Sequence, residues 1–212
     1  GYAAWQHHAD GRAWADATLQ RLKQWRLTTI GAWSDHQTLR QSPEMALWLM
    51  PVLHIGSTAG APWWDMWDPK IIARMDAVAR EQILAVRDDP RLIGYYTDNE
   101  MGWWNATLFK MTLEHAPRSG QRKRLIRLLR ETYDNDWQKL QADFEPENAD
   151  SWSALQRRGQ LYMRSGGDGL KVMRRFLGLL ADRYYQLSRD IIRKYDRRAL
   201  LFGDRYKSFY YP

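Results

Sequence analysis

The chain has 212 residues, of which 44% are hydrophobic and 27% are charged. This balance is typical of a folded globular chain and excludes a disordered chain, a collagen and a coiled-coil rod. The chain contains no cysteine, which excludes a disulfide framework, a thiolate zinc site and a cysteine nucleophile. The longest apolar stretch, residues 45–55, falls short of the roughly 20 residues that span a bilayer. We therefore expect no membrane helix and no membrane partner.

The charge pattern argues against a nucleic-acid partner. Lys and Arg number 32 and Asp and Glu number 25, which gives a formal net charge of +7. The basic residues often stand beside acids, and the densest run, residues 118–130, is typical of one solvated helix face. An RNA- or DNA-binding module, which would bind with steep salt dependence, is therefore the least favoured class. His7 and His8 have no third ligand at metal-binding spacing, so we expect no metal and no cofactor.

Tryptophan is unusually frequent, with 12 residues, and several of them crowd together at Trp63-Trp64, Trp67 and Trp103-Trp104. Flat aromatic faces stack on sugar rings or bases, so paired tryptophans near loops indicate a binding cleft. Core packing is the alternative for each of them.

Helical and apolar β-branched segments alternate along the chain. In chain order the patterns predict a helix at 14–25, a strand at 27–33, a strand at 51–55, a loop at 56–62, a helix at 69–86, a strand at 92–96, helices at 106–115, 121–140, 153–163 and 170–194, with a loop at 143–150 and a turn at 166–169, and a strand at 199–203. Alternating strands and helices predict an α/β fold with a parallel sheet. We expect one domain, residues 1–212, that forms part of a (β/α)₈ TIM barrel with a long helical excursion inside it, because four strands are half of what a barrel needs.

Polar residues follow each predicted strand. They are Asp35 and His36, then His54, then Asp98-Asn99-Glu100, and finally Asp204-Arg205. Because the carboxyl ends of barrel strands meet at one rim, we expect these side chains to converge there. A doubly wound sheet would gather ligands more locally at a switch point, and no glycine-rich phosphate loop follows any strand here, so the barrel is preferred.

Glu100 is the candidate for acid–base chemistry. It ends an apolar strand next to Trp103-Trp104, and a glutamate beside aromatic rings can serve as a general acid for glycosidic cleavage. Asn99 can hydrogen-bond a sugar hydroxyl. The alternative is that Asp98, Asn99 and Glu100 cap the following helix.

Three segments carry a family resemblance: RLKQWRLTTIGAWSD (21–35), DDPRLIGYYTDNEMGWW (88–104) and IIRKYDRRALLFGDRYKSFYYP (191–212). They resemble the catalytic barrel of clan A glycoside hydrolases and are most similar to family 50, the β-agarases. The resemblance implies that the four strands are barrel strands two to five and that the excursion follows strand four. It also implies that Glu100 is the acid/base, that Asn99 faces the sugar 2-hydroxyl and that the nucleophile, a second Glu from strand seven, lies outside this chain.

The resemblance therefore implies a retaining β-glycoside hydrolase that cleaves galactose-containing polysaccharide or oligosaccharide, with the rest of the barrel as its missing partner segment. A β-galactosidase or another clan A specificity, and a non-catalytic carbohydrate-binding barrel, remain as alternatives. A polysaccharide-degrading role favours a periplasmic or secreted location. The candidate substrate contacts, each with a structural role as its alternative, are Asp35, His36, His54, Trp63, Trp64, Asn99, Trp103, Trp104, Asp204, Arg205 and Tyr206.

Overall fold

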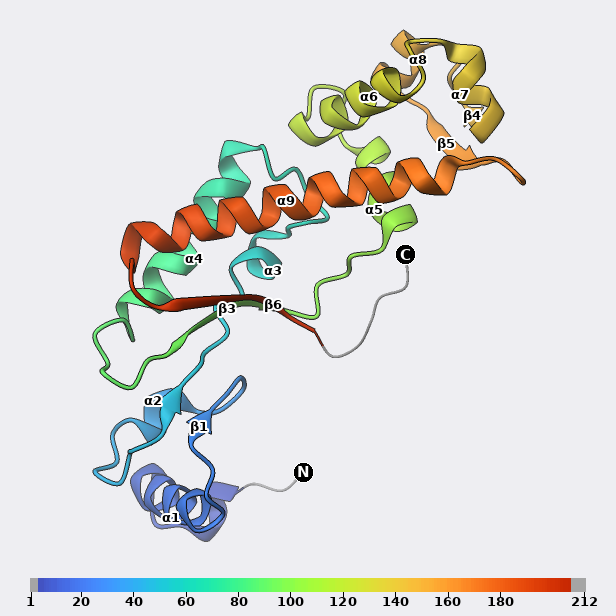
Figure 1. Ribbon diagram of the computed structural model, residues 1–212. Coiled ribbons are helices and arrows are strands. Elements are labelled where there is room, and N and C mark those ends of the chain that lie inside the picture. Colours follow the sequence, from blue (N-terminus) through green and yellow to red (C-terminus); the bar gives the residue numbers. More distant parts are fainter. Residues whose placement is uncertain (1–3, 207–212) are drawn as a thin grey trace.

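The computed structural model describes residues 4–206, which form a mixed α/β structure (Figure 1). After the 3₁₀ turn η1 (Ala4–His7), the first part of the chain contains α1 (Gly11–Gln24), β1 (Thr29–Ile30), α2 (His36–Leu39), β2 (Trp48–Leu49), α3 (Ile55–Ala59), α4 (Pro69–Leu84) and β3 (Gly94–Asn99). The second part contains α5 (Asn105–Glu114), α6 (Gly120–Thr132), α7 (Trp137–Asp143), β4 (Phe144–Glu147), α8 (Trp152–Arg157), β5 (Gln160–Met163), α9 (Gly169–Tyr195) and β6 (Leu200–Arg205). No helix within the described part is both long and apolar enough to cross a membrane.

Four parallel strands form the centre of the structure. β1 pairs with β2, and β3 pairs with β6, both in parallel. Two parallel bridges, Leu49 with Leu92 and Val52 with Tyr96, connect the two pairs. The strands therefore follow the order β1, β2, β3, β6, and their carboxyl ends lie along one edge, which we call the carboxyl edge. The structure confirms the α/β class and the parallel strands. Residues 4–206 contain no closed barrel.

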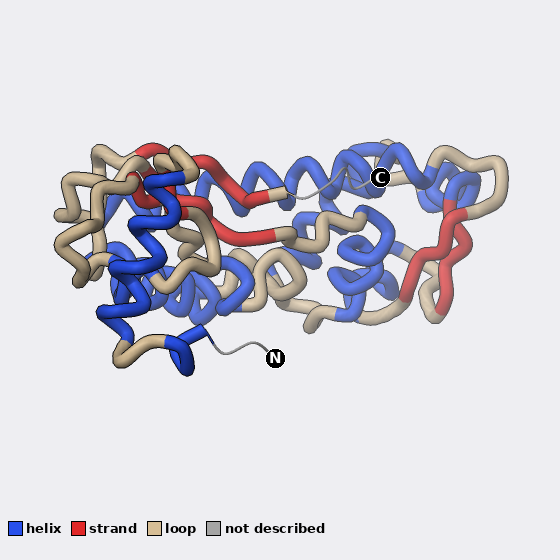
Figure 2. Tube along the Cα trace, turned by 90° about the horizontal axis from the view of Figure 1, so that it is seen from below, coloured by secondary structure: helices blue, strands red, loops and turns tan. Residues whose placement is uncertain are grey.

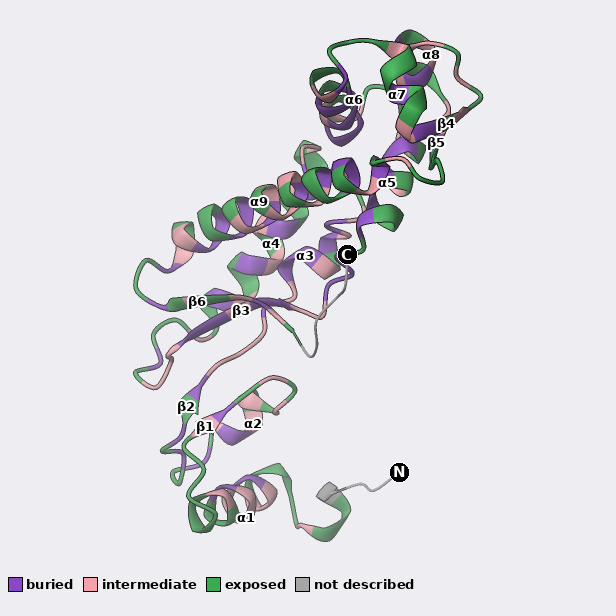
Figure 3. Cartoon of the chain, turned by 45° about the vertical axis from the view of Figure 1, so that its right-hand side comes forward, coloured by how far each residue is buried: buried purple, intermediate pink, exposed green. Residues whose placement is uncertain are grey.

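The long helix α9 covers the β3–β6 pair (Figure 1). Its buried residues recur every three or four positions, which places them on one stripe of the helix (Figure 3). Members of this stripe are Val172, Phe176, Leu180, Tyr184, Leu187 and Ile191. The stripe joins the main core with α4 and α5, while a smaller core lies between α1, α2, β1 and β2.

The excursion between β3 and α9 extends away from the parallel strands. β4 and β5 pair in antiparallel fashion at the end of the molecule opposite β3 and β6 (Figure 2). Arg122 on α6 holds this region together, because its guanidinium donates to the backbone carbonyls of Leu113, His115 and Leu155. The excursion is therefore folded and has its own internal contacts.

Several predicted boundaries differ from the structure. The strand predicted at 27–33 is only two residues long. The strand predicted at 51–55 is a single bridge at Val52, because His54 turns the chain into α3 where a loop was predicted. The helix predicted at 121–140 breaks where Asp134 and Asn135 adopt φ of 51° and 59°. The loop at 143–150 and the helix at 153–163 were also wrong, because these segments hold β4, α8 and β5, and Gly159 ends α8 with φ of 114°.

Candidate functional site

Left-handed residues end three successive parallel strands. Trp33 follows β1 with φ of 60°, His54 follows β2 with φ of 52°, and Glu100 follows β3 with φ of 51°. A side chain makes this conformation unfavourable, at a cost on the order of 1 kcal/mol, so it persists only where the surrounding contacts impose it. Such residues often cluster at functional sites. Three of the seven non-glycine residues with positive φ in residues 4–206 therefore lie at the carboxyl edge.

A chain of contacts links the ends of all four parallel strands. Arg205, at the end of β6, donates from Nη1 to Asn99 Oδ1 over 2.5 Å. The same guanidinium lies 5.4 Å from the centre of the Trp33 ring, and that ring meets His54 edge to face at 5.8 Å. These contacts hold the Asn99 side chain by its oxygen and leave its amide nitrogen to donate elsewhere.

Two residues of β6 fix the backbone around Glu100. Its amide donates to the Arg205 carbonyl over 2.9 Å. The next amide, that of Met101, donates to Asp204 Oδ2 over 3.1 Å, and the indole of Trp103 donates to the same oxygen over 3.0 Å. Glu100 itself is half-buried, and no group in residues 4–206 hydrogen-bonds its carboxylate. The turn is thus anchored on both sides while the acid group stays available.

Asp204 is a buried carboxyl group with one oxygen, Oδ1, that has no partner among the described residues. Burial raises the pKa of Asp204 to about 6, and the negative charges of Asp98 and Glu100 add to the rise, although the hydrogen bonds from Trp103 and Met101 oppose it. Asp204 is therefore an interior residue that holds the Glu100 turn through its hydrogen bonds with Met101 and Trp103.

Asp98 connects β3 to two helices. It is fully buried and accepts hydrogen bonds from the amides of Gly56 and Ser57, from the Ser57 hydroxyl and from the Tyr184 hydroxyl. A side chain at Gly56 would meet the Tyr184 ring at 2.6 Å, so this close approach requires glycine. The residue that caps α5 is Trp104, so Asp98, Asn99 and Glu100 do not cap the helix that follows them.

Asp35 and His36 have local roles in this structure. Asp35 caps α2 by accepting from the Thr38 amide over 3.0 Å, and the hydrogen bonds of Thr38 lower the Asp35 pKa. His36 Nε2 lies 2.7 Å from the Gly31 carbonyl oxygen. Their side-chain hydrogen bonds therefore stay within residues 31–38.

The candidate aromatic residues divide into buried and exposed groups. Trp103 is buried and packs between Tyr184 and Tyr185. Trp104 is exposed and lies against Gly102. Tyr206 lies 2.9 Å from Tyr185, hydroxyl to hydroxyl. Residues 207–212, which end the third resembling segment, lie outside the described residues.

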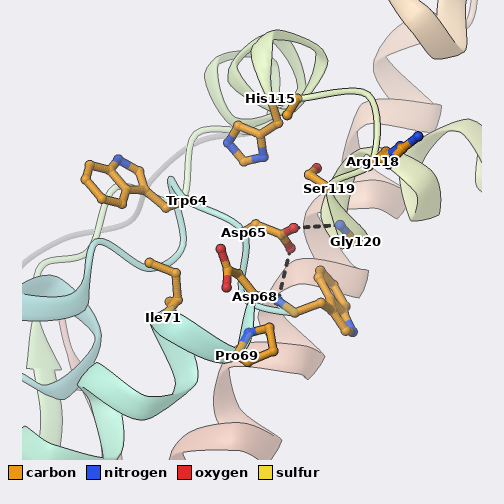
Figure 4. Close-up of a pocket in the computed structure, with 11 residues that line it drawn as sticks. Trp64, Asp65, Asp68, Pro69, Ile71, His115, Arg118, Ser119 and Gly120 are labelled. Carbon is orange, nitrogen blue, oxygen red and sulfur yellow. Dashed lines mark hydrogen bonds between the residues drawn. The ribbon is translucent and has the colours of Figure 1, made fainter.

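The tryptophans after β2 lie in the segment before α4. Trp63 packs against the core, and its carbonyl oxygen lies 2.9 Å from His115 Nε2. Trp64 is 55% exposed and lines a cavity of about 560 Å³ between this segment and the start of α6 (Figure 4). The described residues contain no cluster of three side chains suited to a metal ion.

Sequence reasoning missed Trp33, Tyr184 and Tyr185. Trp33 stands directly at the end of the first predicted strand, a position that could have marked it. The two tyrosines lie in the middle of a helical pattern, and nothing in that pattern shows that the helix crosses behind Asp98 and Trp103.

Comparison with known proteins identifies two β-agarases that are similar to this chain. No protein-family model matches it. Beta-agarase A from Vibrio sp. (strain JT0107) is 33% identical over 110 residues, which are 47% of this chain and 11% of that protein. Beta-agarase B from the same organism is 26% identical over 102 residues, or 44% of this chain and 11% of that protein. The chain is β-agarase-like, with sequence similarity to these two proteins over nearly half of its length.

Solved structures agree with this relation at the level of the fold. An agarase, AgWH50C, matches 91% of this β-agarase-like chain with a TM-score of 0.73 and 19% identity. An exo-β-agarase matches the same share with a TM-score of 0.68 and 19% identity. The chain covers 29% and 28% of those two structures, so it corresponds to part of an agarase fold.

Proposed function

We propose that this chain is the acid/base-bearing part of a retaining β-glycoside hydrolase that cleaves galactose-containing polysaccharide or oligosaccharide. One observation carries the proposal: the Asn99-Glu100 pair closes a parallel strand, at the carboxyl edge, in a chain homologous to β-agarases. That edge is where α/β barrel enzymes gather their reacting groups.

In the proposed enzyme, β1, β2, β3 and β6 are barrel strands two to five, and residues 1–212 form one partial barrel domain. A retaining enzyme uses two carboxyl groups, one as acid/base and one as nucleophile. The chain spans about 11% of the curated relatives it matches and 29% of a matching agarase structure. We place the nucleophile in the part of the agarase fold that these residues do not span.

The proposed reaction divides between Glu100 and Asn99. Protonated Glu100 donates its proton to the leaving glycosidic oxygen as the nucleophile attacks the anomeric carbon and the bond to that oxygen breaks. Glu100, now a carboxylate, then removes a proton from the water that releases the sugar. Asn99 donates from its amide nitrogen to the sugar 2-hydroxyl, because Arg205 already occupies its oxygen.

The test compares wild type, Glu100→Gln and Glu114→Gln in a polypeptide that carries these residues with the rest of the agarase fold. Glu114 is an exposed control on α5. Glu100→Gln should slow hydrolysis of agarose oligosaccharides by about 10²- to 10⁴-fold. Glu100→Gln should slow the bond-breaking step less for activated aryl β-galactosides, since their leaving group needs no proton. Added azide should restore the turnover of this variant, because azide needs no general base.

Three outcomes contradict parts of the proposal. Unchanged hydrolysis by Glu100→Gln would remove Glu100 from the mechanism. No hydrolysis by the wild-type polypeptide, with oligosaccharide binding retained, would favour a non-catalytic carbohydrate-binding barrel. Hydrolysis by the 212-residue chain alone would contradict the location of the nucleophile outside it.

A further inference from the structure

The cavity beside Trp64 is separate from the Glu100 turn. Its volume of about 560 Å³ lies within the range of small-molecule sites. One wall is the segment that leads from β2 to α4, and the other is the connection between α5 and α6 (Figure 4). The first wall follows β2 and α3 along the chain, and the second follows β3 and α5.

Trp64 is held as a platform. Its amide donates to the Gly60 carbonyl over 3.0 Å, and its ring packs directly on Gly60. A Cβ at Gly60 would lie 3.1 Å from the ring, and the residue has φ of 90°, so any other residue would be strained there and would press on the indole. The glycine thus supports one part of a ring that stays 55% exposed. An exposed, supported indole is a surface prepared for stacking.

Asp65 fixes the distance between the two walls. Its carboxylate accepts from the amides of Gly120 and Gln121 at the start of α6, and also from the Trp67 amide in its own wall (Figure 4). His115 adds a second tie through Nε2, 2.9 Å from the Trp63 carbonyl oxygen. The cavity is therefore formed before any ligand arrives, which lowers the entropic cost of binding.

The polar groups of the cavity suit a neutral ligand with hydroxyl groups. Asp68 uses Oδ1 to cap α4, and its Oδ2 makes no hydrogen bond within residues 4–206, so it can accept from a hydroxyl. Arg118 and Ser119 supply donors. Asp65 and Asp68 already occupy the amino ends of α6 and α4 with negative charge, which disfavours an anionic ligand at either helix.

We propose that this cavity is a carbohydrate-binding subsite, separate from the catalytic centre, that stacks one sugar ring of a neutral galactan on Trp64 and hydrogen-bonds it through Asp68. The choice of a galactan rests on the proposed function. The subsite would hold a remote ring of a long chain while another ring lies at Glu100, so it would favour long over short substrates.

Calorimetric titration of the 212-residue chain with a purified agarose hexasaccharide tests the site. Trp64→Ala should weaken binding by roughly tenfold, the scale of one lost aromatic stack. Asp68→Asn should weaken it less. Trp25→Ala is the matched control, since Trp25 is 63% exposed and ends α1, away from the carboxyl edge, and it should bind as wild type. Thermal unfolding should be the same for both tryptophan variants because both side chains are exposed.

The outcomes separate this inference from the proposed function. Absence of hexasaccharide binding by the wild-type chain, or an equal loss in Trp64→Ala and Trp25→Ala, overturns the subsite while the Glu100 chemistry stands on its own test. If binding depends on Trp64 but Glu100→Gln hydrolyses normally, the subsite stands and the catalytic proposal fails.

Discussion

Trp103 Nε1 donates to Asp204 Oδ2 over 3.0 Å, across β3 and β6, which are separated by a hundred residues of sequence. The same oxygen accepts from the Met101 amide, so one buried carboxyl group anchors the backbone immediately after Glu100. Glu100 adopts a left-handed conformation that is costly for glutamate, and Asp204 supplies part of what holds it there.

Asp204→Asn should change how stability depends on pH. The folded pKa of Asp204, about 6, is higher than the usual 3.8 because of burial. Its contribution to stability is therefore fully present below pH 3.8 and is lost as the pH rises through 6, by an amount on the order of 3 kcal/mol. Urea unfolding between pH 4 and 8 should show this decline in wild type and a smaller one in Asp204→Asn.

A matched exposed carboxylate controls for general charge effects in that experiment. Asp88 has a side chain that is 81% exposed, and Asp88→Asn should keep the decline of wild type. Identical pH curves for wild type and Asp204→Asn would mean that Asp204 does not titrate between these pH values.

The contribution of Asp89 to stability should change with pH in the opposite direction. Hydrogen bonds from Arg91, and one from Arg40, lower the Asp89 pKa to about 2 although burial opposes them. Its contribution to stability is present above pH 3.8 and disappears as the pH falls through 2, which amounts to about 2 kcal/mol. Asp89→Asn should therefore lower the free energy of unfolding at pH 7 by at least that amount, and the gap to wild type should shrink near pH 2.5. A gap that is constant with pH would contradict the charged role.

Tyr184 and Tyr185 are neighbours in sequence, but removing their hydroxyl groups should lower stability by different amounts. Tyr184 is fully buried, and its hydroxyl donates to Asp98 Oδ2 over 2.5 Å and lies 2.8 Å from Thr97 Oγ1. Tyr184→Phe leaves a buried carboxylate short of one donor, so it should cost about 2 kcal/mol in urea unfolding. Tyr185→Phe loses the contacts of the hydroxyl with Tyr206 and with the Asp204 backbone, but it leaves no buried carboxylate short of a donor and should cost less than about 1 kcal/mol. Equal losses would show that the hydroxyl of Tyr184 contributes nothing specific.

The sequence predicted the long helices well and the short strands poorly. α4 and α9 lie close to the predicted 69–86 and 170–194 because their buried residues repeat over many turns. A segment of four residues such as β5, three of them apolar, reads equally well as part of a helix. The left-handed turn at Trp33 has no signature in the chain, since tryptophan does not favour that conformation, and a single histidine is too weak a signal to mark the one at His54.

Residues of the candidate site could be predicted from the sequence only where a single segment contained all the evidence for them. Asn99 and Glu100 were identified because they directly follow an apolar strand. The contacts of Arg205 with Asn99 and Trp33 depend on which strands become neighbours, and this is decided by packing across the whole fold. The sequence predicts Asp204 as a candidate substrate contact, whereas in the structure its carboxylate accepts from Met101 and Trp103.

Arg205 offers a kinetic test of how Asn99 is oriented, which rests on the proposed function. Arg205→Ala removes the donor to Asn99 Oδ1, so the amide of Asn99 is free to turn away from the sugar 2-hydroxyl. Arg205→Ala should lower kcat/KM on an aryl β-galactoside about tenfold but hardly affect the 2-deoxy analogue, and adding Asn99→Ala should cause little further loss. Arg198→Ala, an exposed control in the loop before β6, should behave as wild type. Additive losses in Asn99→Ala/Arg205→Ala, or an equal fall on both substrates, would show that Arg205 does not act through Asn99.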